Sequence, residues 1–504
     1  MKNKTLSIVL LALALASCGV SPSSLPSANS STSSAHDSTS SISSVSSTES
    51  EDNAFVDPAS KTYVNRIDEP SSAVTSSFAL SQRLDYAAFY HLPSIDATLN
   101  YSFSSVSDEM KKAYWASKLL PCVVDPKLAS SNGSTITVSF TYYREGTKHY
   151  TNEFYSHMES LLPGLLIDEA NKRADDFSAF PYTERAKTAD VVSTQQLMYA
   201  LEFGYCPLPL EGTPAASALQ QCQAILRRIV NDSMNDVAKY AAIYSYCGAH
   251  LCYDFVGDRY VGYYSKSSAP NALAATDDGF FLDGALRGYA VCEGWTKLFT
   301  VLATMEGLTC YNASGFPISF DYSKSVYSVS NGSWNTHAYN YAEMKGRYYV
   351  IDASWSQLGY ADGYPLGWSY FFVSKTNHEG MSQYTDATYL PSGVTVATTE
   401  FDVFNAMSFS YDNGPVYPFV YASGAALNSL LLYFYQGVKS GYYPSSVGWS
   451  AVVDCTGSTS YVIEEALRPA VANLKTVTGD SVNVSLLQTI SRGSTSYAIL
   501  YIDA

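Results

Sequence analysis

Residues 288–300 read Gly-Tyr-Ala-Val-Cys-Glu-Gly-Trp-Thr-Lys-Leu-Phe-Thr, and Cys292 stands where a new apolar period begins. Apolar residues then recur at helical spacing, at Trp295, Leu298, Phe299, Leu302 and Met305. Gly307 is a common type of helix stop, so the pattern predicts a helix that begins at Cys292. The unpaired amides and the dipole of a helix start favour a negative sulfur, and the thiolate is the nucleophilic form of cysteine. Cys292 is therefore a candidate nucleophile.

Two strand-like runs follow, His337-Ala338-Tyr339-Asn340-Tyr341 and Tyr348-Tyr349-Val350-Ile351-Asp352. If Lys345-Gly346 between them is a two-residue hairpin loop, Met344 opposes Arg347. Continuing this register, Asp352 opposes Tyr339 and Ser354 opposes His337. His337 and Asp352 then become diagonal neighbours on one sheet face, with backbones about 7–8 Å apart. We expect their side chains to form a hydrogen bond.

A cysteine, a histidine and an aspartate in this arrangement suit thiol acyl transfer. The imidazole takes the thiol proton and later protonates a leaving amine, while the carboxylate orients the ring and stabilises its positive form. Taken singly, each residue also has a structural interpretation. A histidine in a strand is more often structural, and an aspartate near a strand end is more often a turn or cap residue.

Taken together, three blocks resemble the transglutaminase-like family of papain-type cysteine enzymes. They are residues 290–295 (Ala-Val-Cys-Glu-Gly-Trp), 337–340 (His-Ala-Tyr-Asn) and 348–355 (Tyr-Tyr-Val-Ile-Asp-Ala-Ser-Trp). They occur in the family's order, with His337 45 residues after Cys292 and Asp352 15 residues after His337. The resemblance covers about residues 232–360. It implies an α+β, papain-like catalytic core with a Cys292–His337–Asp352 triad.

The chain departs from the family's pattern at several positions. Tyr339 stands where tryptophan is usual, and Ser354 where threonine is common; both changes are mild. Papain-like proteases carry an oxyanion-hole glutamine six residues before the nucleophile, and Leu286 occupies that position. The backbone amide of Cys292 is expected to supply one oxyanion donor. Tyr289 is the candidate for the second.

Several other residues near the blocks have structural interpretations. Trp295 and Trp355 are expected to be core aromatics beside the site. Asn340 lies three positions past the histidine, so it should face the other side of the strand. His250 is interpreted as a surface or cap histidine, and Glu293 as a favourable first-turn charge.

The first 18 residues have the features of a secretory signal. Lys2 and Lys4 precede an apolar stretch from Leu6 to Ala16, which is too short for a permanent membrane span. Leu15-Ala16-Ser17-Cys18 resembles the lipobox of bacterial lipoproteins, whose cysteine is acylated; an ordinary signal peptide is the alternative. Acylated Cys18 would hold the chain on the outer side of the cytoplasmic membrane or in an outer membrane.

A Ser-rich linker is predicted for residues 19–60. Residues 21–50 contain 16 serines and almost no large apolar side chain. Such a composition cannot bury enough surface to offset chain entropy, and a coil of this length reaches roughly 30 Å end to end.

The net charge and the cysteine spacing limit which partners and cofactors the chain is expected to bind. The formal net charge is −16, which disfavours nucleic acid because phosphate binding needs clustered Lys and Arg. Apart from Cys18 and Cys292, seven of the nine cysteines remain, an odd number without any CxxC pair. No acidic loop resembles the calcium sites of animal transglutaminases. We therefore predict neither a metal nor another cofactor.

The rest of the chain divides into further expected units. We predict an N-terminal α+β domain at 61–185 with a strand at 134–143, and a helical connector at 186–231 interrupted around 207–214. The transglutaminase-like domain spans 232–390 and begins with a helix near Asp236. A C-terminal α/β domain at 391–504 should contain a helix at 461–474 and strands at 446–453, 481–488 and 497–502.

These features predict a surface-anchored cysteine enzyme that acts on protein or peptide amides through a thioester at Cys292. Water competes as acceptor at about 55 M, and no acceptor-lysine site is visible. Hydrolysis, as a peptidase or deamidase, therefore ranks above amine transfer. The alternative is a non-catalytic surface binding protein on a transglutaminase-like scaffold, although all three triad residues are present. Oligomeric state cannot be read from the sequence.

Overall fold

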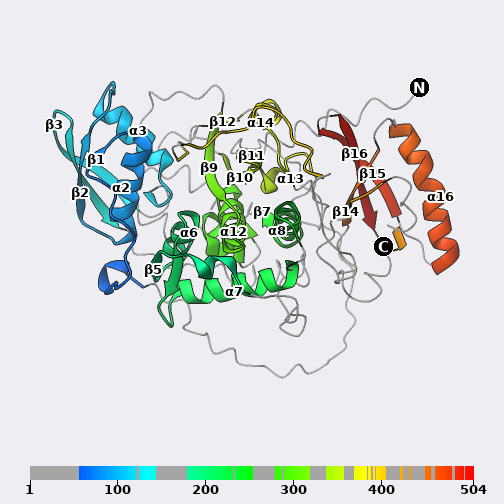
Figure 1. Ribbon diagram of the computed structural model, residues 1–504, viewed down its shortest axis with the longest axis horizontal. Helices are drawn as coiled ribbons and strands as arrows, with labels where there is room; N and C mark the ends of the chain where they lie inside the picture. Colours follow the sequence, from blue (N-terminus) through cyan, green and yellow to red (C-terminus); the bar gives the residue numbers. More distant parts are fainter. Residues whose placement is uncertain are drawn as a thin grey trace, which may run out of the picture.

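The computed structural model describes 56–120, 124–142, 179–230, 232, 234–253, 278–286, 289–317, 337–356, 368–382, 384–386, 390–391, 393–404, 421–423, 431–432, 449–455, 460–479, 483–492 and 494–503. The predicted signal segment, Cys18 and the linker as far as residue 55 lie outside these ranges. The described residues form a mixed α+β structure in which an N-terminal, a central and a C-terminal unit lie in a row (Figure 1).

The N-terminal unit is a four-stranded sheet in the order β1-β2-β4-β3, with two helices on it. Its elements are η2 (Pro58–Ser60), β1 (Ala73–Val74), α2 (Ser77–Phe89), β2 (Ser94–Leu99), α3 (Val106–Ala116), β3 (Val124–Asn132) and β4 (Thr135–Tyr142). The predicted strand at 134–143 is β4, and the expected turn before it contains Gly133 with φ 63°. Alternate β4 side chains, such as Ile136 and Val138, are buried because successive residues of a strand point to opposite faces.

The stretch 186–231, predicted as an interrupted helix, contains two helices and two short strands, and a further helix flanks it on each side. The elements are η4 (Pro181–Glu184), β5 (Thr188–Val191), α6 (Thr194–Glu202), β6 (Cys206–Pro209), α7 (Pro214–Ile229) and α8 (Asp236–His250). Ser193 and Gln196 form a capping box at the start of α6, and Pro214 occupies the first turn of α7. Helix α6 ends at Glu202, before the prolines, where Gly204 has φ 81°, and the residues between the helices form a strand that pairs in parallel with β5.

The central unit holds an antiparallel sheet in the order β11-β10-β9-β12. Its strands are β9 (Cys310–Pro317), β10 (His337–Met344), β11 (Arg347–Ile351) and β12 (Tyr384–Asp386). The helices are η5 (Asp278–Phe280), α11 (Leu282–Leu286), α12 (Cys292–Met305), α13 (Ala353–Ser356) and α14 (Lys375–Ser382), and the short parallel pair is β7 (Cys252–Tyr253) with β8 (Tyr289–Ala290). As predicted, α12 begins at Cys292, and Gly307 follows its end with φ 78°.

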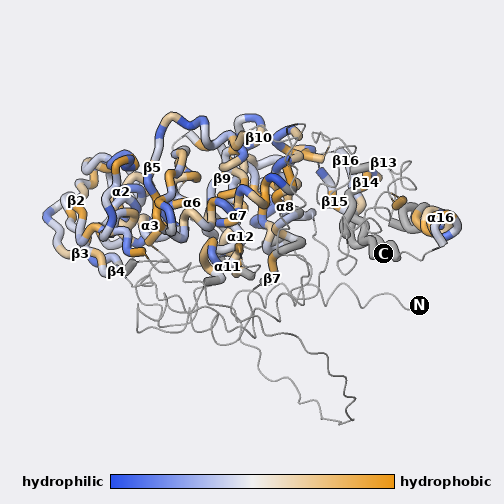
Figure 2. Tube along the Cα trace, turned by 90° about the horizontal axis from the view of Figure 1, so that it is seen from below, coloured by the Kyte–Doolittle hydropathy of each residue, from blue (hydrophilic) through white to orange (hydrophobic). Residues whose placement is uncertain are grey.

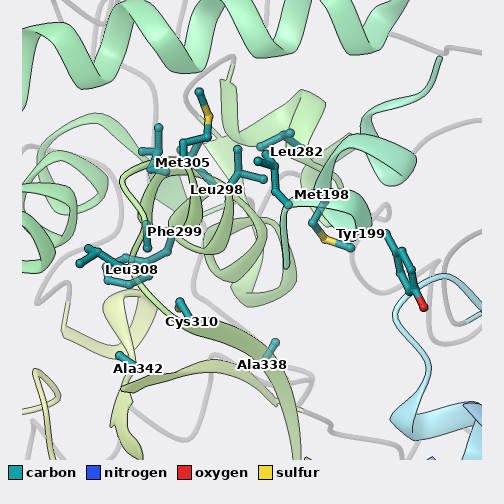
Figure 3. Close-up of a cluster of buried hydrophobic side chains, with 14 of the residues drawn as sticks. Met198, Tyr199, Leu282, Leu298, Phe299, Met305, Leu308, Cys310, Ala338 and Ala342 are labelled. Carbon is teal, nitrogen blue, oxygen red and sulfur yellow. The ribbon is translucent and has the colours of Figure 1, made fainter. Parts of the chain in front are cut away.

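Helix α12 packs on one face of this sheet through apolar side chains (Figure 3). Phe299 of α12 lies on the side of the helix that faces the strands with Cys310, Ala338 and Ala342, whereas Leu298 and Met305 point to the opposite side. Met198 of α6 and Leu282 of α11 complete the same cluster (Figure 3). The small strand residues leave room for the helix to lie close to the sheet.

The C-terminal unit is a second mixed sheet, in the order β13-β14-β16-β15, beside one long helix. Its elements are β13 (Tyr421–Ser423), β14 (Trp449–Asp454), α16 (Ser460–Thr478), β15 (Asn483–Arg492) and β16 (Thr495–Asp503). The structure therefore confirms the helix and the three strands predicted here, with ends that differ by a few residues.

Buried polar and apolar contacts join the three units. Lys118, which follows α3, pairs with Glu202 of α6 at 3.2 Å, and its Nζ also donates to the carbonyl of Asn312 in β9. Tyr199 of α6 meets Phe89 of α2 edge-on, with ring centroids 5.8 Å apart. The apolar cluster that surrounds α12 is continuous from the N-terminal unit to Tyr497 of β16.

The two helices in the middle of the molecule are buried. Figure 2 shows α8 and α12 beside each other in the middle of the molecule, and both helices are largely buried. Within the described part of the chain, no helix combines the length and the apolar character that a membrane span requires.

Candidate active site

Cys292 is the first residue of α12 and is 5% exposed. Val291, the residue before it, has extended backbone and supplies no side-chain cap. The amide of Val291 donates to the carbonyl of Gly279 at 2.9 Å, which ties the helix start to η5. The sulfur thus stands at a helix N-terminus whose partial positive charge no capping side chain offsets.

Two residues of α12, Gly294 and Lys297, let the start of the helix pack against the segment 279–281. A Cβ on Gly294 would collide with the carbonyl oxygen of Gly279 and lie 2.8 Å from the Cβ of Ala290, so only glycine fits without a shift. Lys297 donates from Nζ to the carbonyl of Phe280 at 2.8 Å and pairs with Glu293 at 3.3 Å. Glu293 lies in the first helical turn as expected, and it also neutralises a buried lysine.

The hairpin that carries the histidine and the aspartate has the predicted register. Met344 pairs with Arg347 and Asn340 with Ile351. Lys345 and Gly346 have φ of 52° and 75°, the left-handed pair that a tight two-residue hairpin loop requires.

The ladder ends earlier than predicted. Pairing stops at Ile351, and the chain turns into α13 at Ala353, so Ser354 does not oppose His337. His337 pairs with Gly315 of β9 on the other side of β10, and the amide of Asp352 donates to the carbonyl of Tyr370 at 3.0 Å. A short helix directly after the strand therefore replaces the expected last three pairs, from Asp352 with Tyr339 to Ser354 with His337.

His337 and Asp352 nevertheless meet. Their Nε2 and Oδ2 atoms lie 2.6 Å apart, and each residue is 1% exposed. Burial alone would raise the pKa of Asp352. The charge of His337 and hydrogen bonds from His337 and His378 outweigh burial and hold the pKa of this carboxyl well below its usual range. Asp352 is therefore a buried carboxylate that stays ionised beside an imidazole.

The second oxygen of Asp352 is also held. Oδ1 accepts hydrogen bonds from the Ser354 hydroxyl at 3.1 Å and from the Trp355 amide at 3.2 Å. The ring of Trp355 lies 5.0 Å from that of His337, centroid to centroid. Trp355 is thus a packed aromatic beside the site, half-buried rather than in the core as expected, and α13 fixes the carboxylate from its first turn.

A second histidine, His378 of α14, reaches the same carboxylate, and sequence reasoning missed it. Its Nε2 lies 3.2 Å from Oδ2 of Asp352, and the residue is 1% exposed. Its ring packs on Tyr339 with centroids 4.5 Å apart. Burial lowers the pKa of His378, although Asp352 opposes this shift. The one local signal is Ser374, a typical helix cap four residues earlier; nothing nearby points to Asp352.

Asn340 joins the histidine strand to the cysteine helix. Its Nδ2 donates to the carbonyl of Thr296 at 3.1 Å and to the hydroxyl of Thr300 at 2.8 Å, both on α12. Asn340 therefore has the structural role predicted for it. It fixes β10 relative to the first turns of the helix that carries Cys292.

The remaining predicted positions have separate outcomes. Trp295 is a core aromatic as expected, 1% exposed, and its Nε1 donates to the carbonyl of Ala290 at 3.2 Å. Tyr289 belongs to β8 and pairs with Cys252, but its side chain lies outside the described residues. The same holds for the side chain of His250, the last residue of α8. The second oxyanion donor therefore stays a prediction.

The described cysteines other than Cys292 have no role in this site. Cys206, Cys222, Cys247, Cys310 and Cys455 are free and buried. Burial raises the pKa of each of them, to about 12 for Cys222. They behave as small core residues whose thiols resist ionisation. In the described ranges, no group of three or more His, Cys, Asp or Glu side chains is arranged to hold a metal ion.

No protein-family model and no curated protein matches the chain. Among solved structures, the chain is similar to a TGase (15% identity, TM-score 0.18) and to a candidate protease from Parabacteroides distasonis ATCC 8503 (9% identity, TM-score 0.22). The matches cover 52% and 75% of this chain, and 50% and 61% of those chains. The likeness to both structures is weak.

Proposed function

We propose that the chain is a transglutaminase-like cysteine enzyme in which Cys292, His337 and Asp352 act together on protein or peptide amides. The observation that carries the proposal is the buried 2.6 Å hydrogen bond between His337 and Asp352, on the sheet against which the Cys292 helix packs. The order and spacing of the three sequence blocks support the same assignment.

The proposed reaction has two steps. His337 uses Nε2 for Asp352, so we assign Nδ1 as the atom that takes the thiol proton. The sulfur of Cys292 attacks the amide carbonyl, the C–N bond breaks, and the amine leaves with the proton from the imidazolium. Water then adds to the thioester, releasing the acid and restoring the thiol. Asp352 stabilises the imidazolium and fixes its ring.

The first test is the reactivity of Cys292 toward iodoacetamide at pH 6, where an ordinary thiol reacts slowly. The intact full-length protein is alkylated for a series of times, and each cysteine is quantified by peptide mass spectrometry. We expect rapid labelling of Cys292 that is lost in Cys292→Ala and slowed at least tenfold in His337→Gln. Cys247→Ala is the matched control, a buried thiol with no histidine partner in this scheme. Equal labelling of the wild type and His337→Gln would contradict the proposal.

Hydrolysis is proposed to exceed amine transfer, because an amine acceptor needs a binding site to compete with water. A glutamine-containing protein is incubated with the enzyme and a fluorescent primary amine, and cleavage and released ammonia are measured in parallel. Dominant amine incorporation that requires Cys292 would reverse the ranking. A reactive Cys292 with no turnover across a broad substrate panel would favour the non-catalytic binding scaffold.

Attachment through Cys18 is a separate proposal, based on the lipobox-like run 15–18. Cys18→Ser should abolish metabolic labelling with a fatty-acid analogue and release the protein from the membrane fraction. A variant that is still lipid-labelled would show that Cys18 is not the acylated residue.

A further inference from the structure

His337 is not the only imidazole on Asp352. Oδ2 lies 2.6 Å from Nε2 of His337 and 3.2 Å from Nε2 of His378. Oδ1 accepts hydrogen bonds from the Ser354 hydroxyl and the Trp355 amide. The carboxylate is thus held from three elements at once: β10, α13 and α14.

We propose that His378 is a positioning residue for the Cys292–His337–Asp352 site, because its Nε2–H donates to Oδ2 of Asp352 and fixes the oxygen that binds His337. This inference rests on the proposed function. Without the second donor, the carboxylate could turn about its χ2 bond and present Oδ2 to His337 in a poorer geometry. A misplacement of about 1 Å at a reacting group costs on the order of 10²-fold in rate.

Helix α14 is built to hold His378 in this place. The Ser374 hydroxyl caps the helix by accepting from the amide of Asn377 at 3.2 Å, and the amide of His378 closes the first turn on the Ser374 carbonyl at 2.9 Å. Glu400 accepts from the amide of Ser374 at 3.0 Å and from its hydroxyl at 2.8 Å. The histidine therefore lies on a helix whose start is fixed from outside.

The outside support comes from the C-terminal unit. Arg492, at the end of β15, lies 3.7 Å from Glu400 and donates from Nη2 to the carbonyls of Trp368, Ser369 and Phe371. Between these carbonyls, the Tyr370 carbonyl accepts the amide of Asp352. Arg492 thus contacts both Glu400, which binds Ser374 at the start of α14, and the loop 368–371, which binds the amide of Asp352.

The groups around His378 favour a neutral donor. Asp352 contacts it after β11, Tyr339 and His337 face it from β10, Tyr370 from the loop 368–371, and Glu379 adjoins it on α14. Burial lowers the pKa of His378 and so favours the neutral ring at pH 7. A neutral ring with its proton on Nε2 donates to Asp352 without adding a second positive charge beside the His337 imidazolium.

The test compares His378→Gln with His378→Leu in the full-length protein, with Cys292 alkylation by iodoacetamide as the readout from pH 5 to pH 9. Glutamine keeps an N–H donor at a similar reach, whereas leucine has a similar volume and no donor. We expect the leucine variant to alkylate about 10–100-fold more slowly at pH 6 and the glutamine variant to stay within about threefold of wild type. The matched control is His91→Asn, which removes the imidazole of a different His–Asp contact, with Asp57 at 2.9 Å.

Each outcome decides the inference. If the glutamine and leucine variants lose Cys292 alkylation rate equally, His378 contributes only packing. If the leucine variant loses none, His378 is not a positioning residue, while the proposed function is unaffected. A wild-type Cys292 whose labelling does not depend on His337 would overturn both. If the leucine variant unfolds, the downfield imidazole N–H resonance of His337 is followed instead; it should shift in His378→Gln and not in His91→Asn.

Discussion

Asp85 in the N-terminal unit and Asp352 in the central unit are both 1% exposed, yet their surroundings move their pKa values in opposite directions. Asp85 accepts hydrogen bonds from the Ser117 hydroxyl and from the amides of Lys118 and Leu119, at 3.1 and 3.0 Å for the two amides. Burial outweighs these donors and raises the pKa of Asp85 to about 6. Asp352 has two imidazoles as well, and its pKa falls.

The difference shows that burial of a carboxylate does not by itself mark an active site. Asp85 caps a turn of backbone, and its donors cannot take up or release a proton under ordinary conditions. The donors of Asp352 are side chains that can become positive and share in proton transfer. The hydrogen-bond donors of a buried acid therefore indicate an active site better than its degree of burial does. The following experiments test this distinction.

The largest expected effect is on reactivity in Asp352→Asn. The amide nitrogen would face His337 or His378 with the wrong hydrogen-bond polarity and favour the wrong imidazole tautomer. We expect the rate of Cys292 alkylation at pH 6 to fall by about 10²–10⁴-fold. The same substitution at Asp85 should leave this rate unchanged; a comparable loss there would remove the distinction between the two acids.

A buried ion pair outside the site should affect stability alone. Glu202→Gln leaves the Lys118 ammonium buried without its counterion, 3.2 Å from the substituted group. Breaking such a pair costs about 3–5 kcal/mol of unfolding free energy. Urea unfolding followed by tyrosine fluorescence measures this loss, and Lys187→Gln, which breaks an exposed pair with Asp68, is the control with an expected change below about 1 kcal/mol.

Asp85→Ala should have a somewhat smaller effect on stability. It removes the acceptor of one hydroxyl and two amides in a buried turn, and unsatisfied buried donors cost about 1–3 kcal/mol. We expect a loss of about 2–3 kcal/mol by urea unfolding at pH 5, with unchanged Cys292 labelling of the folded protein. Stability equal to that of wild type would mean that the turn after α3 does not need its cap.

The pH dependence of stability should have opposite signs for the two acids. The folded-state pKa of Asp85 is raised, so its contribution is full below about pH 4 and is lost as the pH rises through about 6. The pKa of Asp352 is lowered, so its contribution is present above about pH 4 and is lost as the pH falls through its low folded-state value. Between pH 4 and pH 7, the stability difference between wild type and Asp85→Asn should therefore shift by about 2–3 kcal/mol toward the variant. The difference for Asp352→Asn should stay level over this range; urea unfolding at four pH values distinguishes the two.

The parts of the site that could be predicted from sequence depend on local rules. The start of α12 follows from apolar spacing after Cys292, and the hairpin register follows from two residues, Lys345 and Gly346, whose backbone conformation fixes all pairs beyond them. The prediction was wrong only where the ladder ends, because α13 begins right after Asp352 and its hydrogen bonds compete with further pairing.

Contacts between distant segments could not be predicted in this way. His378 lies 26 residues after Asp352, and only tertiary packing of α14 brings the two together. Strand β6 was missed because Pro207 and Pro209 indicate a break, whereas a strand with one neighbour tolerates residues that lack an N–H. The ion pair of Lys118 and Glu202 joins positions 84 residues apart, and neither has a local pattern that names the other.

Lys118 also bears on how this chain could have been assembled from parts. Its ammonium enters the central unit, binds the carbonyl of Asn312 and neutralises Glu202. A recombination event that exchanged the N-terminal unit for one without this lysine would leave a buried, uncompensated acid beneath β9. Such an exchange would survive only if position 202 changed with it, so we expect a lysine at 118 and an acid at 202 to be inherited as a pair.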